Sequence, residues 1–314
     1  MKILLSVQEF DSCFRDMYEK LSQIAIVDVA DLDNYTLEDY DIFIGKMLKK
    51  EKLDNANKLK VIFTYKTGVD GFPLEELAKR NIMLVNSHAD SKIIAEYAFG
   101  LTISLVNRIT EFDHDLRKGI WYHSENEYWN SIFSMKIGLL GYGHIGKAIH
   151  QILLNNQIDT YTIDRGHSYQ NINLVKNINE LIDQCDVLIC SVPMTKETTD
   201  LIDQKLLSKM HNKYIVNIGR YNVINQESLY QALKEKTLKA AAIDTWEEKP
   251  KNKNELLLPS KYDFHGLKNI IITPHSAMRV AEGHKNYVDD IYIKIRKYLE
   301  FNQLTDVVDY KKGY

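Results

Sequence analysis

The residues Gly138-Leu139-Leu140-Gly141-Tyr142-Gly143-His144-Ile145-Gly146 place glycines in the spacing G-x-G-x-x-G. A short apolar strand ends at Leu140, and a helix is expected from Ile145 to Leu153. Gly141 permits a tight turn, Gly143 lets a pyrophosphate approach the backbone, and Gly146 allows the helix to pack closely on the strand. The helix N-terminus, with His144 and Ile145, offers free N–H groups to phosphates. This stretch therefore predicts a dinucleotide-binding turn.

An acidic residue stands where such a turn needs one, at the end of the next strand and roughly 20 residues further on. Asp164 closes the strand 160–163, and its carboxylate can accept hydrogen bonds from both adenosine ribose hydroxyls. It would also repel a 2′-phosphate, whereas Arg165 could receive one. NAD is therefore the expected cofactor, with NADP less favoured. The bland alternative is that Asp164 only starts a turn and Arg165 is a solvated charge.

Composition excludes several classes of function. The chain of 314 residues, 45% of them hydrophobic, can fill two cores. Its net charge of −3 argues against nucleic-acid or membrane-surface partners, and the first residues resemble a strand rather than a signal peptide. Three cysteines without a C-x-x-C pattern fit a reducing cytoplasm, and the ten histidines form no metal motif. We expect a cytoplasmic protein without a metal, nucleic-acid or membrane partner.

Strand-like and helix-like segments alternate along the chain, which predicts α/β architecture with parallel strands. Before the glycine turn, strands are expected over 3–7, 24–27, 40–44, 59–64 and 82–85, with helices over 10–23, 73–79 and 91–117. From the turn onward, strands are expected near 136–141, 160–163, 186–191, 214–218, 239–243 and 270–272, followed by a helix over 277–301.

The glycine turn lies in mid-chain, behind a complete βαβ series, so one βαβ domain interrupts another. Residues 98–280 are predicted to form a Rossmann dinucleotide-binding domain. It is inserted in a flavodoxin-like substrate domain made of residues 1–97 and 281–314. The active site is expected in the cleft between the two domains.

Further motifs occur in order, and together they resemble the D-isomer-specific 2-hydroxyacid dehydrogenase family. The matching stretches are D-x-x-x-x-x-x-P-x-T-x-x-T at 186–198, N-x-x-R at 217–220, a variant of D-V-F-x-x-E-P at 244–250, T-P-H-x-A at 273–277, the substrate loop at 65–70 and Ala95-Glu96. The resemblance implies an oxidoreductase that moves a hydride between NAD(H) and a small 2-keto or D-2-hydroxy acid.

Two residues at strand ends carry the implied chemistry. Arg220 ends an apolar strand, where its guanidinium could hold a substrate carboxylate and polarise the neighbouring carbonyl; the alternative is a surface ion pair. His275 follows another strand and Pro274. Its imidazolium would protonate the oxyanion left by hydride transfer, and neutral His275 would take the proton back in the oxidative direction. The family context favours this role over that of a structural histidine.

The third catalytic member of the family, a glutamate that supports the histidine, has no direct counterpart. Counting five residues from Asp244 leads to Lys249, and an ammonium there would lower the pKa of His275. Three alternatives remain open: Glu248 takes the part after a one-residue shift, Glu247 does, or the pairing is lost. We favour Glu248, because loops absorb such shifts readily.

The resemblance also implies the remaining contacts. Beyond the glycine turn, cofactor contacts are expected from Val192, Pro193, Thr198, Ile218, Gly219 and Asp244. In the substrate loop Lys66, Thr67, Gly68 and Val69, backbone N–H groups near the glycine would bind the substrate carboxylate. Lys66 would suit a second carboxylate or a phosphate, or it is simply a solvated lysine.

Two departures from the family pattern keep the substrate open. Tyr221 stands where the family has glycine after the arginine, and residues 87–90 lack the glycine usual before the interdomain helix. The alternative function is an NAD-binding regulator that keeps the fold but turns over poorly. A homodimer is implied, formed through the cofactor domain and residues 93–129.

Overall fold

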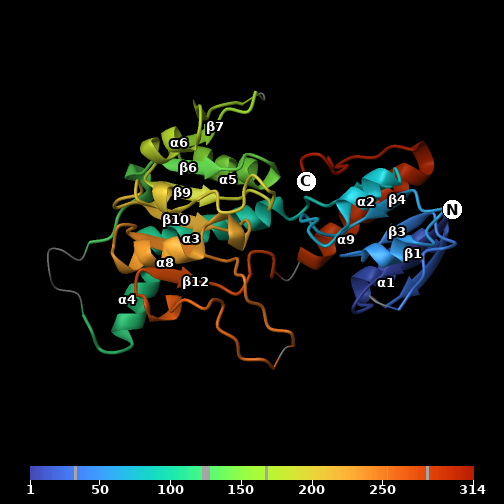
Figure 1. Ribbon diagram of the computed structural model, residues 1–314, viewed down its shortest axis with the longest axis horizontal. Helices are drawn as coiled ribbons and strands as arrows, with labels where there is room; N and C mark the ends of the chain where they lie inside the picture. The colour runs from blue at the N-terminus through green and yellow to red at the C-terminus, as the bar shows by residue number, and fades with distance from the viewer. Residues whose placement is uncertain (32–33, 122–127, 167–168, 253, 281–282) are drawn as a thin grey trace. The chain divides into compact units, whose positions relative to one another are not determined.

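The computed structural model describes the chain except for residues 32–33, 122–127, 167–168, 253 and 281–282 (Figure 1). It divides into unit 1, Met1–Asp90 with Val280–Tyr314, and unit 2, Ser91–Arg279. The first division comes earlier than the predicted residue 97, which lies inside helix α3 (Ser91–Val106). All of α3 falls in unit 2 because it packs on helix α5 (His144–Asn155) and on strands of that unit.

Unit 1 is a five-stranded parallel sheet with the order β2-β1-β3-β4-β5, which is the flavodoxin-like order. The second strand begins at Ile26, two residues later than predicted, because the N–H groups of Ile24 and Ala25 still bond to the carbonyl of Leu21. The strands are β1 (Lys2–Ser6), β2 (Ile26–Ala30), β3 (Ile42–Ile44), β4 (Val61–Phe63) and β5 (Met83–Val85), and the helices are α1 (Ser12–Ser22), α2 (Leu74–Lys79) and α9 (Gly283–Phe301).

Unit 2 is a seven-stranded parallel sheet with the order β12-β11-β10-β9-β6-β7-β8, a Rossmann order extended by one strand. Six strands were predicted; the seventh, β8 (Asn173–Val175), is a three-residue edge strand with too little apolar pattern to be recognised. The other strands are β6 (Ile137–Leu140), β7 (Thr160–Ile163), β9 (Val187–Cys190), β10 (Tyr214–Asn217), β11 (Ala240–Ile243) and β12 (Ile270–Ile272), and the helices not yet named are α4 (Ile109–Leu116), α6 (Ile178–Gln184), α7 (Gln204–Leu207) and α8 (Gln226–Lys234).

Two predicted helices differ from the observed ones. The helix expected over 91–117 breaks between α3 and α4, where Arg108 adopts a left-handed φ of 56° and its guanidinium bonds to Glu111 at 2.9 and 2.8 Å. Of the helix expected over 277–301, residues 277–280 are not helical, because the N–H of Arg279 closes a turn on the carbonyl of Ser276 at 2.8 Å; α9 is described over Gly283–Phe301.

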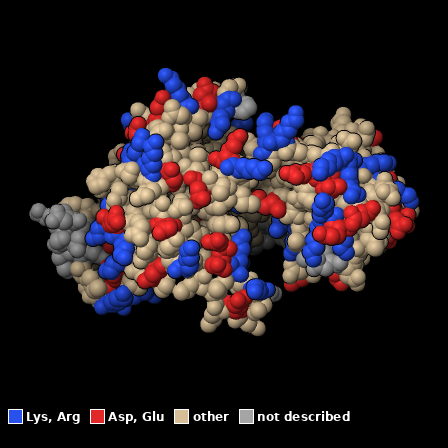
Figure 2. Space-filling view, in the orientation of Figure 1, with Lys and Arg blue, Asp and Glu red and all other residues tan. Residues whose placement is uncertain are grey.

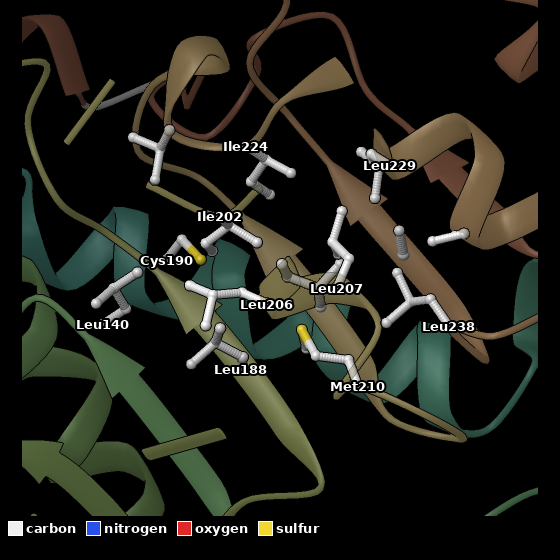
Figure 3. Close-up of a cluster of buried hydrophobic side chains, with 14 of the residues drawn as sticks. Leu140, Leu188, Cys190, Ile202, Leu206, Leu207, Met210, Ile224, Leu229 and Leu238 are labelled. Atoms are coloured by element: carbon white, nitrogen blue, oxygen red, sulfur yellow. The ribbon is translucent and has the colours of Figure 1, made fainter. Parts of the chain in front are cut away.

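Alternation along β9 divides the core of unit 2 between the two faces of its sheet. Leu188 and Cys190 point toward Ile202 and Leu206 on one face, as Figure 3 shows. Val187 and Ile189 join the cluster formed with α3 and α5 on the other face. A strand buried on both faces is typical of parallel sheets, and it leaves functional groups to the strand ends.

The surface carries charges of both signs. On the face shown in Figure 2, acidic and basic side chains are interspersed over each unit, and neither sign dominates. Among the described residues, no helix is both long enough and apolar enough to cross a membrane.

Candidate dinucleotide and catalytic site

The glycine turn joins β6 to α5 through unusually close backbone packing. Gly141 has a φ of +107°, which side-chain-bearing residues rarely adopt. A Cβ atom on Gly146 would lie 2.1 Å from the carbonyl oxygen of Gly141, so only glycine fits there. A Cβ on Gly143, the N-cap of α5, would meet nothing within 4 Å. The turn is therefore shaped by Gly141 and Gly146, while Gly143 leaves the approach to the helix N-terminus open.

Ser191, which the sequence analysis did not single out, ties the glycine turn to the end of β9. Its hydroxyl donates to the Gly141 carbonyl at 3.2 Å, and its N–H donates to the Leu140 carbonyl at 2.9 Å. Its position directly after the apolar run of β9 could have indicated that Ser191 lies at the strand edge near the glycine turn.

Asp164 and Arg165 lie exposed after β7. The carboxylate of Asp164 accepts the N–H of Gly166 at 2.8 Å, which is a local turn. The N–H of Arg165 donates to the hydroxyl of Tyr169 at 2.9 Å. The expected ribose-binding acid thus closes a turn and keeps an exposed carboxylate at the strand end.

A buried histidine connects the glycine turn with the segment that follows β7. Nδ1 of His150, on α5, lies 2.6 Å from the hydroxyl of Tyr142, and Nε2 lies 3.0 Å from the carbonyl oxygen of Asn171. The carbonyl requires an N–H on Nε2, so neutral His150 accepts the Tyr142 proton at Nδ1. Burial lowers the pKa of His150, which favours this neutral form. The Tyr142 ring also packs on Tyr169, with centroids 5.2 Å apart.

The loop after β9 is closed by its own threonines. Thr198 Oγ1 accepts the N–H of Thr195 at 2.8 Å and donates to the Pro193 carbonyl at 2.7 Å. A Cβ on Gly219 would lie 2.7 Å from the Val192 carbonyl oxygen, so the segments after β9 and β10 are in close backbone contact. The structure thereby brings together the predicted residues Val192, Pro193, Thr198, Ile218 and Gly219.

Asp244 holds the loop that carries His275. Its carboxylate is fully buried after β11 and accepts hydrogen bonds from the Thr273 hydroxyl at 2.6 Å and from the N–H groups of Ser276 and Ala277 at 2.7 and 3.2 Å. Between these donors His275 adopts a left-handed φ of 55°. The side chain of Asp244 thus positions this loop, and its contact with a cofactor remains a prediction.

Arg220 and His275 follow strands separated only by β11, at the same carboxyl edge of the sheet. Arg220 is half-buried, and its Nη1 donates to the Gly219 carbonyl at 3.0 Å. His275 is exposed. A guanidinium and an imidazole at this edge can bind an anion and transfer a proton.

Glu248 lies in the exposed stretch that follows Trp246. Buried Trp246 donates from Nε1 to the Thr273 carbonyl at 3.0 Å, and the chain then turns outward, leaving Glu248 exposed. Within the described parts of the chain, no hydrogen bond or ion pair joins the Glu248 carboxylate to His275. Glu247 and Lys249 are exposed as well. The support of His275 by Glu248 remains a prediction.

In unit 1, the predicted substrate loop is fixed by the segment after β5. Asn86 donates from its amide to the Thr67 carbonyl at 2.8 Å, and the Thr67 hydroxyl donates to the Ser87 carbonyl at 2.9 Å. Lys66 is exposed and Val69 is buried. The loop is thus built from backbone held by side chains.

Comparison with known proteins gives concordant results. Residues 99–277 match the family model described as D-isomer specific 2-hydroxyacid dehydrogenase, NAD binding domain. A glyoxylate reductase of Thermofilum pendens is 32% identical over 249 residues, 76% of this chain and 71% of that protein. A D-3-phosphoglycerate dehydrogenase of Methanocaldococcus jannaschii is 29% identical over 285 residues, which is 87% of this chain. The match spans about half, 52%, of that relative's length. A solved structure from Pyrococcus horikoshii has a TM-score of 0.82 at 27% identity and covers 99% of this chain and 96% of its own.

The packing at Gly146 predicts a difference between two alanine variants of the turn. Gly146→Ala should lower the free energy of unfolding by about 1–3 kcal/mol, because the new methyl group meets the Gly141 carbonyl. Gly143→Ala should change stability by less than about 1 kcal/mol, yet weaken NADH binding because its methyl group stands over the helix N-terminus. Thermal unfolding and NADH fluorescence measure both. A fully stable Gly146→Ala protein would contradict this packing.

Burial of neutral His150 predicts a pH dependence. Its pKa is lowered in the folded protein, so below the unfolded-state pKa of about 6.5 the unfolded chain takes up a proton that the folded chain does not. The free energy of unfolding should therefore fall as the pH drops from 7.5 to 5.5, and it should fall further in the wild type than in His150→Gln. Urea unfolding at each pH measures this. Parallel curves for the two proteins would show that His150 is not held neutral.

Proposed function

Because this chain belongs to the D-isomer-specific 2-hydroxyacid dehydrogenase family, we propose that it reduces a small 2-keto acid to the D-2-hydroxy acid with NADH, or catalyses the reverse reaction. The observation that carries the proposal is the shared strand edge of unit 2, which presents the glycine turn, Arg220 and His275 together. The family, the α/β fold, the dehydrogenase class and the nicotinamide dinucleotide, NAD or NADP, are confirmed as predicted.

The residues of the glycine turn fit a dinucleotide. The open approach at Gly143 and the N–H groups at the start of α5 suit a pyrophosphate. The exposed carboxylate of Asp164 suits a ribose, and this is our reason for favouring NAD over NADP. When bound, the nicotinamide supplies or accepts the hydride.

The chain's own residues handle the acid and the proton. Arg220 would hold the substrate carboxylate with its planar guanidinium and polarise the adjacent carbonyl. His275 would donate a proton to the oxygen of the reduced carbonyl and accept it in the reverse direction. In the substrate loop, the N–H groups of Gly68 and Val69 would bind a substrate carboxylate. Asp244 is a positioning residue in this scheme, because it fixes the backbone on both sides of His275.

A homodimer in the cytoplasm belongs to the same proposal. The segment 93–129 exposes large apolar side chains, and its residues 122–127 lie outside the described part of the chain. Exposed apolar groups gathered along one segment suit a protein interface. They are Ile109, Leu116, Ile120, Trp121, Tyr128 and Trp129. All three cysteines are free thiols, as a reducing compartment would leave them.

Direct turnover tests the reaction. Purified protein should oxidise NADH in the presence of glyoxylate or pyruvate, with NADPH less effective, as followed by nicotinamide absorbance. His275→Asn should lower kcat by about 10²–10⁴-fold, because the general acid is lost, while NADH binding persists. Binding of NADH without turnover of any 2-keto acid would instead indicate the regulator. Tighter binding of NADPH would mean that Arg165 outweighs Asp164.

For the carboxylate that supports His275, we keep Glu248, whose exposed side chain would have to turn toward the histidine. Glu248→Gln should lower kcat on the order of 10²-fold, because it removes this support. The neighbouring Glu247→Gln, also exposed, tests the second alternative: a loss of kcat there and not in Glu248→Gln would assign the part to Glu247. If neither variant loses activity, the pairing is absent and only the Asp244 network orients the loop.

A further inference from the structure

A lysine on helix α9 of unit 1 is buried together with its charge. Lys294 is only 6% exposed, and its ammonium lies 2.8 Å from the Asn86 carbonyl oxygen, 2.7 Å from Asp290 and 2.8 Å from Asp306. The two carboxylates come from α9 itself and from the C-terminal segment. One ammonium therefore joins three separate parts of unit 1.

Such a cluster is poorly explained by stability alone. Removing an ammonium from water costs much of what its attraction to the carboxylates returns, and apolar residues of similar volume often fill such a place equally well. An ammonium does provide directional hydrogen bonds, which fix the relative placement of the segments it joins. The acceptors of the Lys294 ammonium therefore indicate which segments it holds in place.

The placed segment is the pair Asn86-Ser87 directly after β5. Besides the bond from Lys294 to its carbonyl, Asn86 donates its N–H to the Asp306 carbonyl at 3.2 Å. The Ser87 hydroxyl donates to the Asp290 carboxylate at 2.7 Å, the same oxygen that the ammonium contacts. Both residues are thereby anchored to the cluster.

The same pair holds the substrate loop. The Asn86 amide donates to the Thr67 carbonyl at 2.8 Å, the Thr67 hydroxyl donates to the Ser87 carbonyl at 2.9 Å, and the Ser87 N–H donates to the Lys66 carbonyl at 3.1 Å. Three hydrogen bonds thus fix the two residues immediately before Gly68.

We propose that Lys294, neutralised by Asp290 and Asp306, is a positioning residue that sets the substrate loop for binding the substrate carboxylate. The ammonium acts on the loop through Asn86 and Ser87 and does not touch the substrate. This inference rests on the proposed function, in which the N–H groups of Gly68 and Val69 receive that carboxylate.

The first test separates substrate binding from the rest of the reaction. Lys294→Met combined with Asp306→Asn removes the ammonium and one carboxylate together, so that less unpaired charge stays buried. KM for glyoxylate should rise about tenfold or more, while kcat and KM for NADH change less than about twofold. Lys297→Met, exposed on the same helix, is the matched control and should match the wild type. An unchanged KM for glyoxylate would overturn the proposal.

The second test asks whether the effect passes through Asn86. Asn86→Ala should raise KM for glyoxylate by itself, and adding it to the Lys294→Met/Asp306→Asn protein should cause little further increase, since both changes release the same loop. Fully additive effects on KM would contradict the proposed route.

The third test needs no turnover. Amide hydrogen exchange followed by mass spectrometry should be faster at residues 66–69 in the Lys294→Met/Asp306→Asn protein and unchanged in Lys297→Met. Exchange that stays unchanged at 66–69, or that rises uniformly throughout unit 1, would overturn the positioning role. A wild type without keto-acid turnover would contradict the proposed function alone, and hydrogen exchange would still decide the role of Lys294.

Discussion

The candidate catalytic site depends on the hydrogen bonds that the fully buried carboxylate of Asp244 accepts. A carboxylate without water must be satisfied by donors, and here they all come from the segment 273–277 after the neighbouring strand. These hydrogen bonds hold the backbone on both sides of His275, which has a positive φ. This backbone is therefore held by a residue that follows another strand.

The other groups of the site follow from the parallel sheet. Its strands end at one edge, so residues distant in sequence become neighbours without long-range side-chain contacts. The narrow fits at Gly146 and Gly219 bring backbone segments within contact at that edge, and Ser191 bonds two of them together. The dinucleotide turn, Arg220 and His275 thus lie at one edge of the same sheet. Hydride and proton transfer to one substrate would require such groups to lie on the same structural element.

Much of this arrangement could be predicted from the sequence, because apolar strands and glycine spacing are local patterns. The α/β fold and the strands with long apolar runs followed from them, whereas the family was indicated by the resemblance of the further motifs at 186–198, 217–220 and 273–277. The edge strand β8 was missed because three residues carry little pattern. The turn at 276–279, where a helix was expected, was missed because it follows a loop held by Asp244, more than 30 residues away in sequence.

Two buried polar residues, His150 and Lys294, could not be predicted as such. Both lie in helices, where the periodicity of the sequence does not indicate that a polar side chain is buried and hydrogen-bonded. Their partners, Tyr142 and Asn171 for the histidine and Asn86 for the lysine, come together only in the folded chain. Glu248 is a different case: its place in the motif suggested a contact with His275, its side chain is exposed after Trp246, and the contact stays a prediction.

The fate of an isotopic label tests the central claim most directly. NADH deuterated at C4 on either face should be supplied with pyruvate, and the lactate analysed by NMR and chiral chromatography. We predict D-lactate carrying deuterium at C2 from one of the two labelled cofactors and none from the other. L-lactate, or lactate without deuterium from either cofactor, would contradict direct hydride transfer at this site.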